Sequence, residues 1–421
     1  MASDIAIIGA GYVGLPLAVA FGQAGKHVHC IDTDPDKVAA IGQGRSYISD
    51  VSSDHVAALA GAGLLTAGDD FAAVAETGAI LICVPTPLSE NREPDVSIIA
   101  AASSAIAPHL QRGQLVVLES TTYPGTTREL VAPLLEQSGL SAGSDFHLAM
   151  SPERIDPGRT DHTVRTTPKV VGGLTAACAE RARDLYAVCV DTIVPVSSPD
   201  AAELVKLLEN IFRSVNIALV NELAMLCERL GLDVWEVIDA AATKPYGFMR
   251  FTPGPGLGGH CIPIDPFYLS WRARQFDFQT EFIELAGKVN TSMPYFCAER
   301  VSQALNEVRK PVRGSRVLVL GVSYKPDVGD VRESPALKLI ELLGGLGAEI
   351  SYHDPYVPDL RDQGLDLRSV DLDDGTVAAA DIVCVVTAHS GIDYADLADR
   401  AQLVFDFRNV VPRIEGRVHT L

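Results

Sequence analysis

Short, almost uninterrupted apolar runs alternate with helical patterns along the N-terminal part of the chain. A strand of a parallel sheet that is covered on both faces is apolar throughout, so each run predicts such a strand. The four runs are Ile5–Ile8, Val28–Ile31, 80–84 and Leu115–Leu118. The segments between them, such as 15–24 and 36–43, have helical spacing. Strands that alternate with helices predict a doubly wound parallel sheet.

A long helical pattern dominates the middle of the chain. Residues 201–230 contain neither glycine nor proline, residues 198–200 provide start signals, and Gly231 provides a stop. A helix of about 30 residues is about 45 Å long at 1.5 Å per residue, which is enough to connect two domains and to carry an interface. A loop rich in glycine and proline follows at 252–266, and a second helical stretch follows at 278–308.

The alternation of strands and helices returns after Ser315. Further strands are predicted at 317–320, 349–353, 381–387 and 403–407, with a helix at 334–346. We therefore expect an α/β fold with two Rossmann-like doubly wound domains joined by a long central helix and a helical connector. The expected boundaries are 1–198 for the first Rossmann-like domain, 199–310 for the central helical domain and 311–421 for the second Rossmann-like domain.

The composition limits the possible functions. The chain has 421 residues, with 34 Lys and Arg against 54 Asp and Glu, so its formal net charge is −20. A hydrophobic share of 47% and a charged share of 21% exclude a disordered or collagen-like chain. The acidic excess argues against nucleic acid or an anionic membrane as a partner, because both attract clustered Lys and Arg. It leaves room for a small phosphorylated ligand that backbone amides hold.

The spacing of cysteine and histidine predicts neither a disulfide framework nor a metal site. Eight cysteines are dispersed without a CxxC pair, which is typical of reduced thiols in a cytosolic protein. His27 and His29 would share one face of a strand, but two ligands without a third do not form a metal site. We therefore expect no bound metal.

Residues 5–25 carry no charged side chain and are nearly long enough to span a bilayer. Five glycines interrupt the stretch, and Asp4 rather than a basic segment precedes it. It therefore predicts a buried strand, a glycine turn and a buried helix. We expect a soluble, cytoplasmic protein with no membrane partner.

The motif Gly9-Ala10-Gly11-Tyr12-Val13-Gly14 is a GxGxxG between a predicted strand and a predicted helix. Its glycines allow a tight turn, close approach of a pyrophosphate and close packing of helix on sheet. Asp32 ends the second strand, where a carboxylate accepts hydrogen bonds from ribose hydroxyls and repels a 2′-phosphate. The motif predicts a dinucleotide site that prefers NAD over NADP.

A glycine-dense loop at 253–265 carries one thiol, Cys261, and one carboxylate four residues later, Asp265. Glycine is costly to order, so its density indicates that the backbone approaches another group closely. The residues alone leave two interpretations of Cys261, an ordinary buried cysteine beside a turn or a reactive thiol.

Seven motifs occur in order along essentially the whole chain. They are IAIIGAGYVGLPLA at the N-terminus, VPTP at 84–87, ESTTYPGTT at 119–127, SPERIDPGR at 151–159, ELVKLLEN at 203–210, GPGLGGHCIPIDPFYL at 254–269 and YKPDVGDVRES at 324–334. In these motifs the chain resembles the nucleotide-sugar 6-dehydrogenases, the family of UDP-glucose, UDP-N-acetylglucosamine and UDP-N-acetylmannosamine dehydrogenases. SPERIDPG, KPYGFMRF and GGHCIPIDPFYL look most like the UDP-N-acetylglucosamine branch. The UDP-glucose branch more often has serine and lysine where this chain has His260 and Ile264.

The resemblance implies a four-electron oxidation of a sugar CH2OH to a carboxylate, with two NAD+ reduced. Cys261 would add to the intermediate aldehyde, and the thiohemiacetal would be oxidised to a thioester that water hydrolyses. Lys206 and Asn210, one turn apart on the long helix, would stabilise the oxyanion. Glu153 would be the base for hydrolysis, with Asp265 and Thr121 positioning water.

The resemblance also implies the binding residues. The cofactor-binding positions are Gly9, Gly11, Tyr12, Val13, Gly14, Asp32, Lys37, Thr86, Thr121, Glu153 and Arg332. The substrate-binding positions are Glu153, Arg154, Lys206, Asn210, Arg250, Gly258, Lys325 and Arg408. Family members commonly pair through the central helices, so a homodimer is expected, and Arg250 matches a position that reaches the substrate of a partner subunit.

Several alternatives remain open at this stage. The sugar and the base are not fixed, so a UDP-glucose or TDP-glucose 6-dehydrogenase is the main alternative to a UDP-N-acetylglucosamine enzyme. A two-electron NAD dehydrogenase of the hydroxyacid type and a non-catalytic NAD-binding protein are more distant ones. Cys261 in its loop argues against both of these, and Asp32 argues against an NADP-preferring enzyme.

Overall fold

The computed structural model describes residues 3–48, 50–89, 93–155, 162–259 and 262–421. The chain divides into two compact units. The first unit contains Met1–Glu209 and Phe267–Gln279, and the second contains Asn210–Pro266 and Thr280–Leu421. These units are not the three predicted domains, whose boundaries at 198 and 310 stay a prediction.

The first unit is built on a mostly parallel sheet. Over the described residues its strand order is β3-β2-β1-β4-β5-β6-β7-β8, and the pair β6 and β7 is antiparallel. The strands are β1 (Ile5–Ile8), β2 (Val28–Ile31), β3 (Leu65–Gly68), β4 (Ala79–Ile82), β5 (Leu115–Leu118), β6 (His147–Met150), β7 (Lys169–Gly173) and β8 (Ile193–Val196). The four predicted strands are confirmed, although β4 ends at Ile82 and not at residue 84. The order reverses between β1 and β4, where ligands bind in open α/β sheets.

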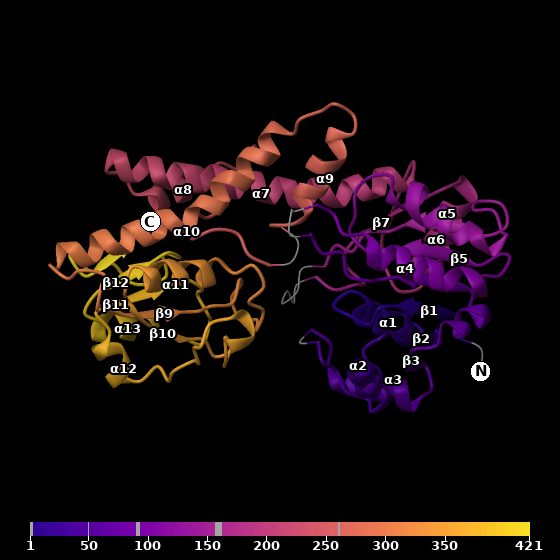
Figure 1. Ribbon diagram of the computed structural model, residues 1–421, viewed down its shortest axis with the longest axis horizontal. Helices are drawn as coiled ribbons and strands as arrows, with labels where there is room; N and C mark the ends of the chain where they lie inside the picture. Colours follow the sequence, from indigo (N-terminus) through magenta and orange to yellow (C-terminus); the bar gives the residue numbers. More distant parts are fainter. Residues whose placement is uncertain (1–2, 49, 90–92, 156–161, 260–261) are drawn as a thin grey trace. The chain divides into compact units, whose positions relative to one another are not determined.

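Both faces of this sheet are buried, which explains the apolar runs. Ile5 and Ile7 of β1 pack in a cluster with α1, α3 and α6, whereas Ala6 and Ile8 pack in a cluster with α4 and α5 (Figure 1). The helices of this unit are α1 (Gly14–Gln23), α2 (Pro35–Gly42), α3 (Ser53–Gly61), α4 (Ser97–Ile106), α5 (Ala132–Leu135), α6 (Ala176–Tyr186) and, from Phe267 onward, α9 (Asp265–Arg274). Single helical turns are η1 (Phe71–Glu76), η2 (Ala107–His109), η3 (Thr127–Val131) and η4 (Glu136–Ser138).

The second unit contains a smaller parallel sheet. Its order over the described residues is β10-β9-β11-β12-β13, with β9 (Arg316–Leu320), β10 (Glu349–His353), β11 (Ile382–Val385), β12 (Val404–Asp406) and β13 (Val418–Thr420). Its helices are α8 (Val234–Ala242), α10 (Glu281–Glu307), α11 (Pro335–Gly345), α12 (Asp374–Ala379), α13 (Tyr394–Arg400) and the turn η5 (Arg361–Gln363). One face packs against α10 and α11, and the other against α12 and α13 (Figure 1). The expected α/β fold with two Rossmann-like sheets is confirmed.

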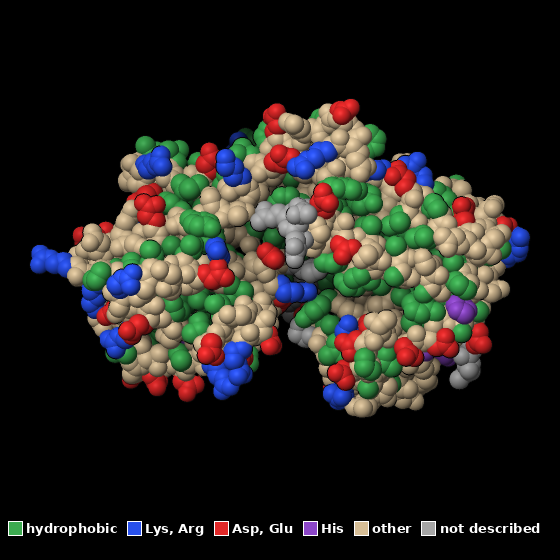
Figure 2. All heavy atoms as spheres, viewed as in Figure 1, with side chains coloured by type: hydrophobic (Ala, Val, Ile, Leu, Met, Phe, Trp, Pro, Cys, Tyr) green, Lys and Arg blue, Asp and Glu red, His purple; other side chains and the backbone are tan. Residues whose placement is uncertain are grey.

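The predicted long helix is confirmed as α7 (Pro199–Leu230), which begins in the first unit and continues into the second. Its start lies two residues before the predicted one. The glycine-rich loop is shorter than expected, because Asp265 already begins α9. Among the described helices none combines the length and the apolar character that a bilayer crossing requires. On the face drawn in Figure 2, acidic and basic side chains are interspersed.

A buried carboxylate fixes the start of α7. Glu203 is fully buried, its Oε2 accepts a hydrogen bond of 2.6 Å from the Gly125 N–H, and its Oε1 accepts bonds of 2.8 and 2.7 Å from the N–H and Oγ1 of Thr127. Burial raises the pKa of Glu203 to about 7, because these donors only partly replace the water that the carboxylate has lost. The contact ties α7 to the segment that follows β5.

Replacing Glu203 with Gln tests this burial. A carboxyl group whose pKa is raised in the folded state stabilises the fold most at low pH, and this contribution is lost as the pH rises through 7. The unfolding free energy of the wild type relative to Glu203→Gln should therefore fall by about 2–3 kcal/mol between pH 5 and pH 8 in denaturant titrations. The exposed Glu180→Gln is the matched control and should show no such trend. A difference that stays constant with pH would show that Glu203 titrates as an ordinary acid.

Candidate active site

The glycine motif forms a tight turn between β1 and α1. Gly9 has a φ of +92°, and a Cβ there would lie 2.8 Å from the carbonyl oxygen of Cys83. A Cβ on Gly14 would lie 1.9 Å from the carbonyl oxygen of Gly9, so only glycine fits at either position. A Cβ on Gly11 would meet nothing within 4 Å. A side chain would therefore clash at Gly9 and Gly14, whereas free space surrounds Gly11, where a pyrophosphate-binding turn needs room for the ligand.

Asp32 is bonded to this turn. Its Oδ2 accepts a hydrogen bond of 2.8 Å from the Ala10 N–H, and its Oδ1 accepts one of 2.9 Å from the Asp34 N–H. The Nζ of Lys37 lies 3.5 Å from Oδ2. A carboxylate offers about four lone-pair positions, so Asp32 retains acceptor capacity for ribose hydroxyls. Tyr12 is exposed and Val13 is half-buried beside it.

Tyr47 is a residue of this region that the sequence analysis missed. Its hydroxyl donates a hydrogen bond of 2.6 Å to the carbonyl of Ala10 and so supports the glycine turn from the loop after α2. Burial, with Cys30 and Asp32 nearby, raises its pKa out of the physiological range, so it stays a donor. No local motif marks Tyr47, because the contact joins segments 37 residues apart.

Two threonines meet at the ends of β4 and β5. The Oγ1 of Thr86 donates a hydrogen bond of 2.8 Å to the carbonyl of Thr121. The Tyr268 hydroxyl of α9 donates bonds of 2.5 and 3.2 Å to the carbonyls of Thr86 and Pro87. The VPTP and ESTTYPGTT motifs therefore adjoin within the first unit, and Tyr268, whose role was not foreseen, holds them from the FYL end of the cysteine-loop motif.

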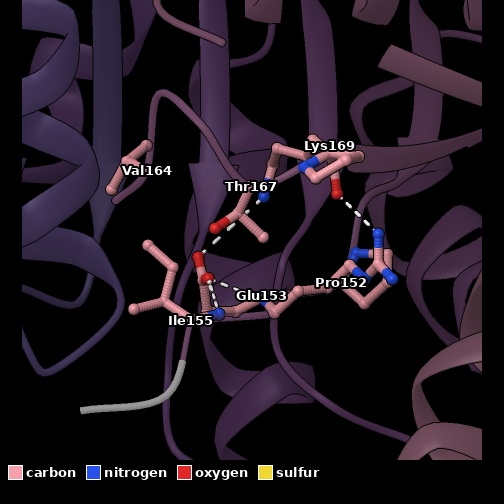
Figure 3. A pocket seen from close by; sticks show the side chains of 8 residues that line it. Pro152, Glu153, Ile155, Val164, Thr167 and Lys169 are labelled. Atoms are coloured by element: carbon pink, nitrogen blue, oxygen red, sulfur yellow. Dashed lines mark hydrogen bonds and ion pairs between the residues drawn. The ribbon is translucent and has the colours of Figure 1, made fainter. Parts of the chain in front are cut away.

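Glu153 lies in a small pocket that is lined by 152–155, Val164 and 167–169. Its Oε1 accepts hydrogen bonds of 2.7 and 2.6 Å from the N–H groups of Arg154 and Ile155, and its Oε2 lies 4.0 Å from the Nζ of Lys169 (Figure 3). The guanidinium of Arg154 donates to the carbonyl of Pro168 and forms an ion pair of 2.7 Å with Glu209. The described part of SPERIDPGR ends at Ile155.

The apolar residues around Lys206 in the sequence suggest a buried segment of α7, but Leu204 and Leu208 are 42% and 62% exposed. Lys206 is only 8% exposed, because it points to the opposite side of α7. Leu207 is fully buried.

Asn210 and Asp265 meet within the second unit. The Nδ2 of Asn210 donates a hydrogen bond of 2.5 Å to the Oδ2 of Asp265, and both side chains are buried. The Nη2 of Arg213 donates a bond of 2.7 Å to the Oδ1 of Asn210. Arg213 was missed, although its i, i+3 spacing from Asn210 on α7 could have indicated the contact.

The glycines of the cysteine loop allow close packing. A Cβ on Gly254 would lie 2.7 Å from the Nη1 of Arg408, and one on Gly258 would lie 2.6 Å from the Cβ of Tyr324. The Gly254 N–H donates a hydrogen bond of 3.0 Å to the Oδ1 of Asn221. His260 and the predicted nucleophile Cys261 lie outside the described residues. The seven described cysteines are all buried, and burial raises the pKa of Cys384, for example, to about 12.

The predicted cations of the second unit differ in their surroundings. Arg408 is half-buried with its Nε donating a bond of 2.6 Å to the carbonyl of Val386, and burial lowers the pKa of its guanidinium. Lys325 is half-buried, and its carbonyl accepts a bond of 2.9 Å from the Oγ of Ser323. Arg332 and Arg250 are exposed and form ion pairs with Asp330 and Asp239, at 2.6 and 2.7 Å. No cluster of three potential metal-ligating side chains occurs in the described part of the chain.

Comparison with known proteins covers most of the chain. Three models of the UDP-glucose/GDP-mannose dehydrogenase family match it, the NAD binding domain at 3–190, the central domain at 200–292 and the UDP binding domain at 318–413. UDP-N-acetyl-D-mannosamine dehydrogenase of Pyrococcus horikoshii is 34% identical over 413 residues, which are 97% of this chain and 96% of that protein. UDP-N-acetyl-D-glucosamine 6-dehydrogenase of Pseudomonas aeruginosa is 36% identical over 84% of this chain and 83% of that protein.

A solved structure agrees with these matches. The UDP-D-ManNAc dehydrogenase of Pyrococcus horikoshii has a TM-score of 0.90 at 33% identity, covering 99% of this chain and 98% of that one. The glycine turn, the half-buried Asp32 that bonds to it and the NAD binding domain model together agree with NAD as the cofactor. The chain belongs to the UDP-glucose/GDP-mannose dehydrogenase family of NAD-dependent nucleotide-sugar oxidoreductases.

Proposed function

We propose that the protein oxidises the C6 hydroxymethyl group of a UDP-linked N-acetylated hexosamine, with UDP-N-acetylglucosamine as the first candidate, to the uronic acid. Two NAD+ are consumed per sugar. The observation that carries the proposal is the bond between Asn210 and Asp265. It joins the ELVKLLEN motif to the residue four positions after Cys261, so two motifs assigned to the same reacting carbon meet in a buried, polar environment.

The roles of the reacting side chains follow from their chemistry. The thiolate of Cys261 adds to the aldehyde carbon, and the resulting C–O⁻ can lose a hydride to leave a thioester. The ammonium of Lys206 and the amide N–H of Asn210 stabilise the oxyanion at each stage. Glu153 takes a proton from the water that attacks the thioester, while Thr121 and Asp265 position water. The C–S bond then breaks, and Cys261 is regenerated.

The cofactor site is assigned to the first unit. The N–H groups at the start of α1 would hold the pyrophosphate above Gly11, beside Tyr12 and Val13, and Asp32 would accept from the adenosine ribose hydroxyls with Lys37 next to it. Thr86, Thr121 and Glu153 follow strands of the same sheet edge. Bound NAD supplies a hydride acceptor. Arg332 is a further NAD contact carried over from the family.

The proposed nucleotide-sugar contacts include two cations of the second unit. The UDP binding domain model at 318–413 includes Lys325 and Arg408, two cations suited to a diphosphate. Gly258, Glu153, Arg154, Lys206 and Asn210 complete the proposed substrate contacts. Arg250 is exposed in KPYGFMRF, and we assign it to the substrate of a partner subunit.

We further propose a homodimer through α7. Six large apolar side chains of this helix are exposed, and at 3.6 residues per turn they fall within about 80° of its circumference. They are Leu204, Leu208, Phe212, Leu219, Leu226 and Leu230. Scattered exposed leucines are ordinary, but an aligned stripe on one long helix is typical of a covered surface.

A substrate panel tests the reaction. We expect two NADH per sugar consumed, and the highest kcat/KM with UDP-N-acetylglucosamine among UDP- and TDP-linked glucose, N-acetylglucosamine, N-acetylmannosamine and galactose. One NADH per sugar would overturn the four-electron reaction in favour of a two-electron dehydrogenase. A clear preference for UDP-N-acetylmannosamine, the substrate named for the Pyrococcus relative, would replace only the sugar. Cys261→Ser should lower kcat by at least about 10³-fold, whereas Cys227→Ser should not.

Replacing Asp32 with Asn tests the cofactor assignment. The amide keeps one acceptor for the turn but removes the charge that binds the ribose hydroxyls, so the Kd for NAD should rise about 10-fold and the preference for NAD over NADP should narrow. Fluorescence titration with both dinucleotides measures this. Asp36→Asn, an exposed acid close in sequence, makes the same change of charge and should leave both Kd values unchanged. Unaltered binding to Asp32→Asn would refute the ribose contact.

Replacing Leu208 with Asp tests the dimer. A carboxylate in the middle of the apolar stripe would be buried without a partner, so the dimer Kd should rise at least 100-fold. Light scattering at micromolar concentration measures the mass. Leu346→Asp, another exposed leucine away from α7, is the control. A monomeric wild type, or a dimer that survives Leu208→Asp, would contradict this interface.

A further inference from the structure

A buried ion pair lies beneath Glu153 in the first unit. The Nζ of Lys169, the first residue of β7, lies 2.8 Å from the Oε2 of Glu119, the residue that follows β5. Their side chains are 7% and 0% exposed. Removing two charges from water costs more than an isolated pair usually returns, and an apolar pair of similar size would stabilise the sheet at least as well. The pair therefore needs an explanation other than stability.

The ion pair belongs to a longer chain of contacts. The Tyr186 hydroxyl of α6 donates a short hydrogen bond to the Oε1 of Glu119, so both oxygens of this carboxylate are engaged. On its other side Lys169 faces Glu153, whose Oε2 lies 4.0 Å from Nζ (Figure 3). The order of contacts is Tyr186, Glu119, Lys169 and Glu153. It runs from a buried tyrosine to the rim of a pocket.

Glu153 is held at both of its oxygens in different ways. The two N–H groups at 154 and 155 fix Oε1, whereas Oε2 has the ammonium of Lys169 on its buried side. The side chain keeps 16% of its surface exposed. Oε1 is therefore occupied by the backbone, whereas Oε2 has the ammonium of Lys169 as its neighbour 4.0 Å away.

The charges near Glu153 agree with this arrangement. Burial would lower the pKa of Lys169, but Glu119 and Glu153 outweigh it and raise that pKa, so the ammonium stays charged. Burial raises the pKa of Glu119 to about 7, against the opposing effect of Lys169. Among the described residues, the charged or titratable groups near Glu153 include Glu119, Lys169, the buried thiol of Cys83 and the paired Arg154.

We infer that Lys169 is a positioning residue for thioester hydrolysis, which holds the Oε2 of Glu153 ionised and oriented while Glu119 and Tyr186 hold Lys169. This inference rests on the proposed function. In the step itself a water O–H bond breaks, its proton passes to Oε2 of Glu153, and its oxygen bonds to the thioester carbon. The C–S bond then breaks, and the Cys261 thiolate leaves. No oxidant or further reactant is needed.

Replacing Lys169 with Met is the direct test. The carboxylates of Glu119 and Glu153 both lie near the Lys169 ammonium, so removing this cation removes a charge that favours the ionised form of Glu153. The acidic limb of the pH profile of kcat should move up by about 1–2 pH units, so kcat at pH values below the wild-type limb should fall by about 10- to 100-fold, whereas kcat at pH 9.5 should stay within a few-fold of wild type. The KM for the sugar nucleotide should stay within about two-fold, because Lys169 does not touch substrate.

Two further variants separate this role from folding. Lys169→Arg keeps the charge and should restore the wild-type acidic limb. Lys169→Met combined with Glu119→Gln removes both buried charges, so it should fold even if Lys169→Met does not, and it should still show the shifted limb. Lys338→Met removes an exposed lysine that pairs with Glu341 and is the matched control. If the double variant keeps the acidic limb of the wild-type kcat profile, Lys169 only supports the fold.

Rapid-mixing experiments identify the affected step. If hydrolysis is slowed, the Lys169→Met enzyme should release a burst of two NADH per active site and should carry an acyl group on Cys261 by intact mass. A variant that turns over slowly with no burst and no adduct would overturn the inference, because an earlier step would then be impaired. The wild-type enzyme separates a failure of the Lys169 proposal from a failure of the proposed function. If the wild type forms only one NADH per sugar, the four-electron oxidation itself is refuted.

Discussion

The burial of both faces of the two parallel sheets dictates where polar chemistry can lie. The strand residues of β1, β4 and β5 are buried on both sides, so no charged side chain can be placed along them without an internal partner. Polar groups are therefore concentrated where the strands end. Asp32 follows β2, Glu119 follows β5, and Glu153 lies shortly after β6. The GxGxxG turn follows β1 at the same edge.

The second sheet also has a carboxylate at the end of a strand that accepts hydrogen bonds from the turn after the neighbouring strand. Asp354 follows β10, the neighbour of β9, and its Oδ2 accepts hydrogen bonds of 2.8 and 3.0 Å from the N–H groups of Val322 and Ser323, which follow β9. Asp32 after β2 does the same for Ala10 after β1. Burial works to raise the pKa of Asp354, but His389 and backbone donors outweigh it and lower that pKa. In each sheet a carboxylate anchors the first turn at the strand reversal, and in the second sheet this turn leads to Lys325.

The sequence predicted only some of the elements that are buried on both sides, and it missed β3, β6 and β7 although every residue of β7 is buried. Runs such as Ile5–Ile8 and Leu115–Leu118 and the long helix α7 agree with the structure, because local pattern and tertiary burial coincide there. It did not predict β13, whose residues Val418–Thr420 are only half-buried, or β8, which contains Pro195. Nor does the sequence show that Leu204 and Leu208 are exposed, since dense apolar residues on a helix do not reveal which face is covered. The side of α7 is set by packing partners far away in sequence.

The same limit applies to the site. Motifs supplied Asp32, Thr86, Glu153, Asn210 and Asp265, and the structure brings Asn210 together with Asp265. The residues that orient them were invisible in the sequence. Tyr268 reaches Thr86 across 182 positions, and Lys169 reaches Glu119 across 50. Such residues act through a contact between distant segments, so no local spacing marks them.

In this acidic chain the basic side chains proposed to bind ligand fall into two groups, exposed ones and ones that are at least half-buried. On the surface, Arg250 and Arg332 already lie against aspartates, so an arriving phosphate would compete with a carboxylate for each guanidinium. Such exposed pairs are weak and screened by salt, so they yield easily to a more highly charged ligand. Lys206 is buried and Arg408 is half-buried, so the attraction of an anion is less weakened by water there and the side chain loses less entropy on binding. A net charge of −20 is therefore compatible with a doubly phosphorylated substrate, because Lys206 and Arg408, two of the cations proposed to bind it, are not paired with carboxylates at the exposed surface as Arg250 and Arg332 are.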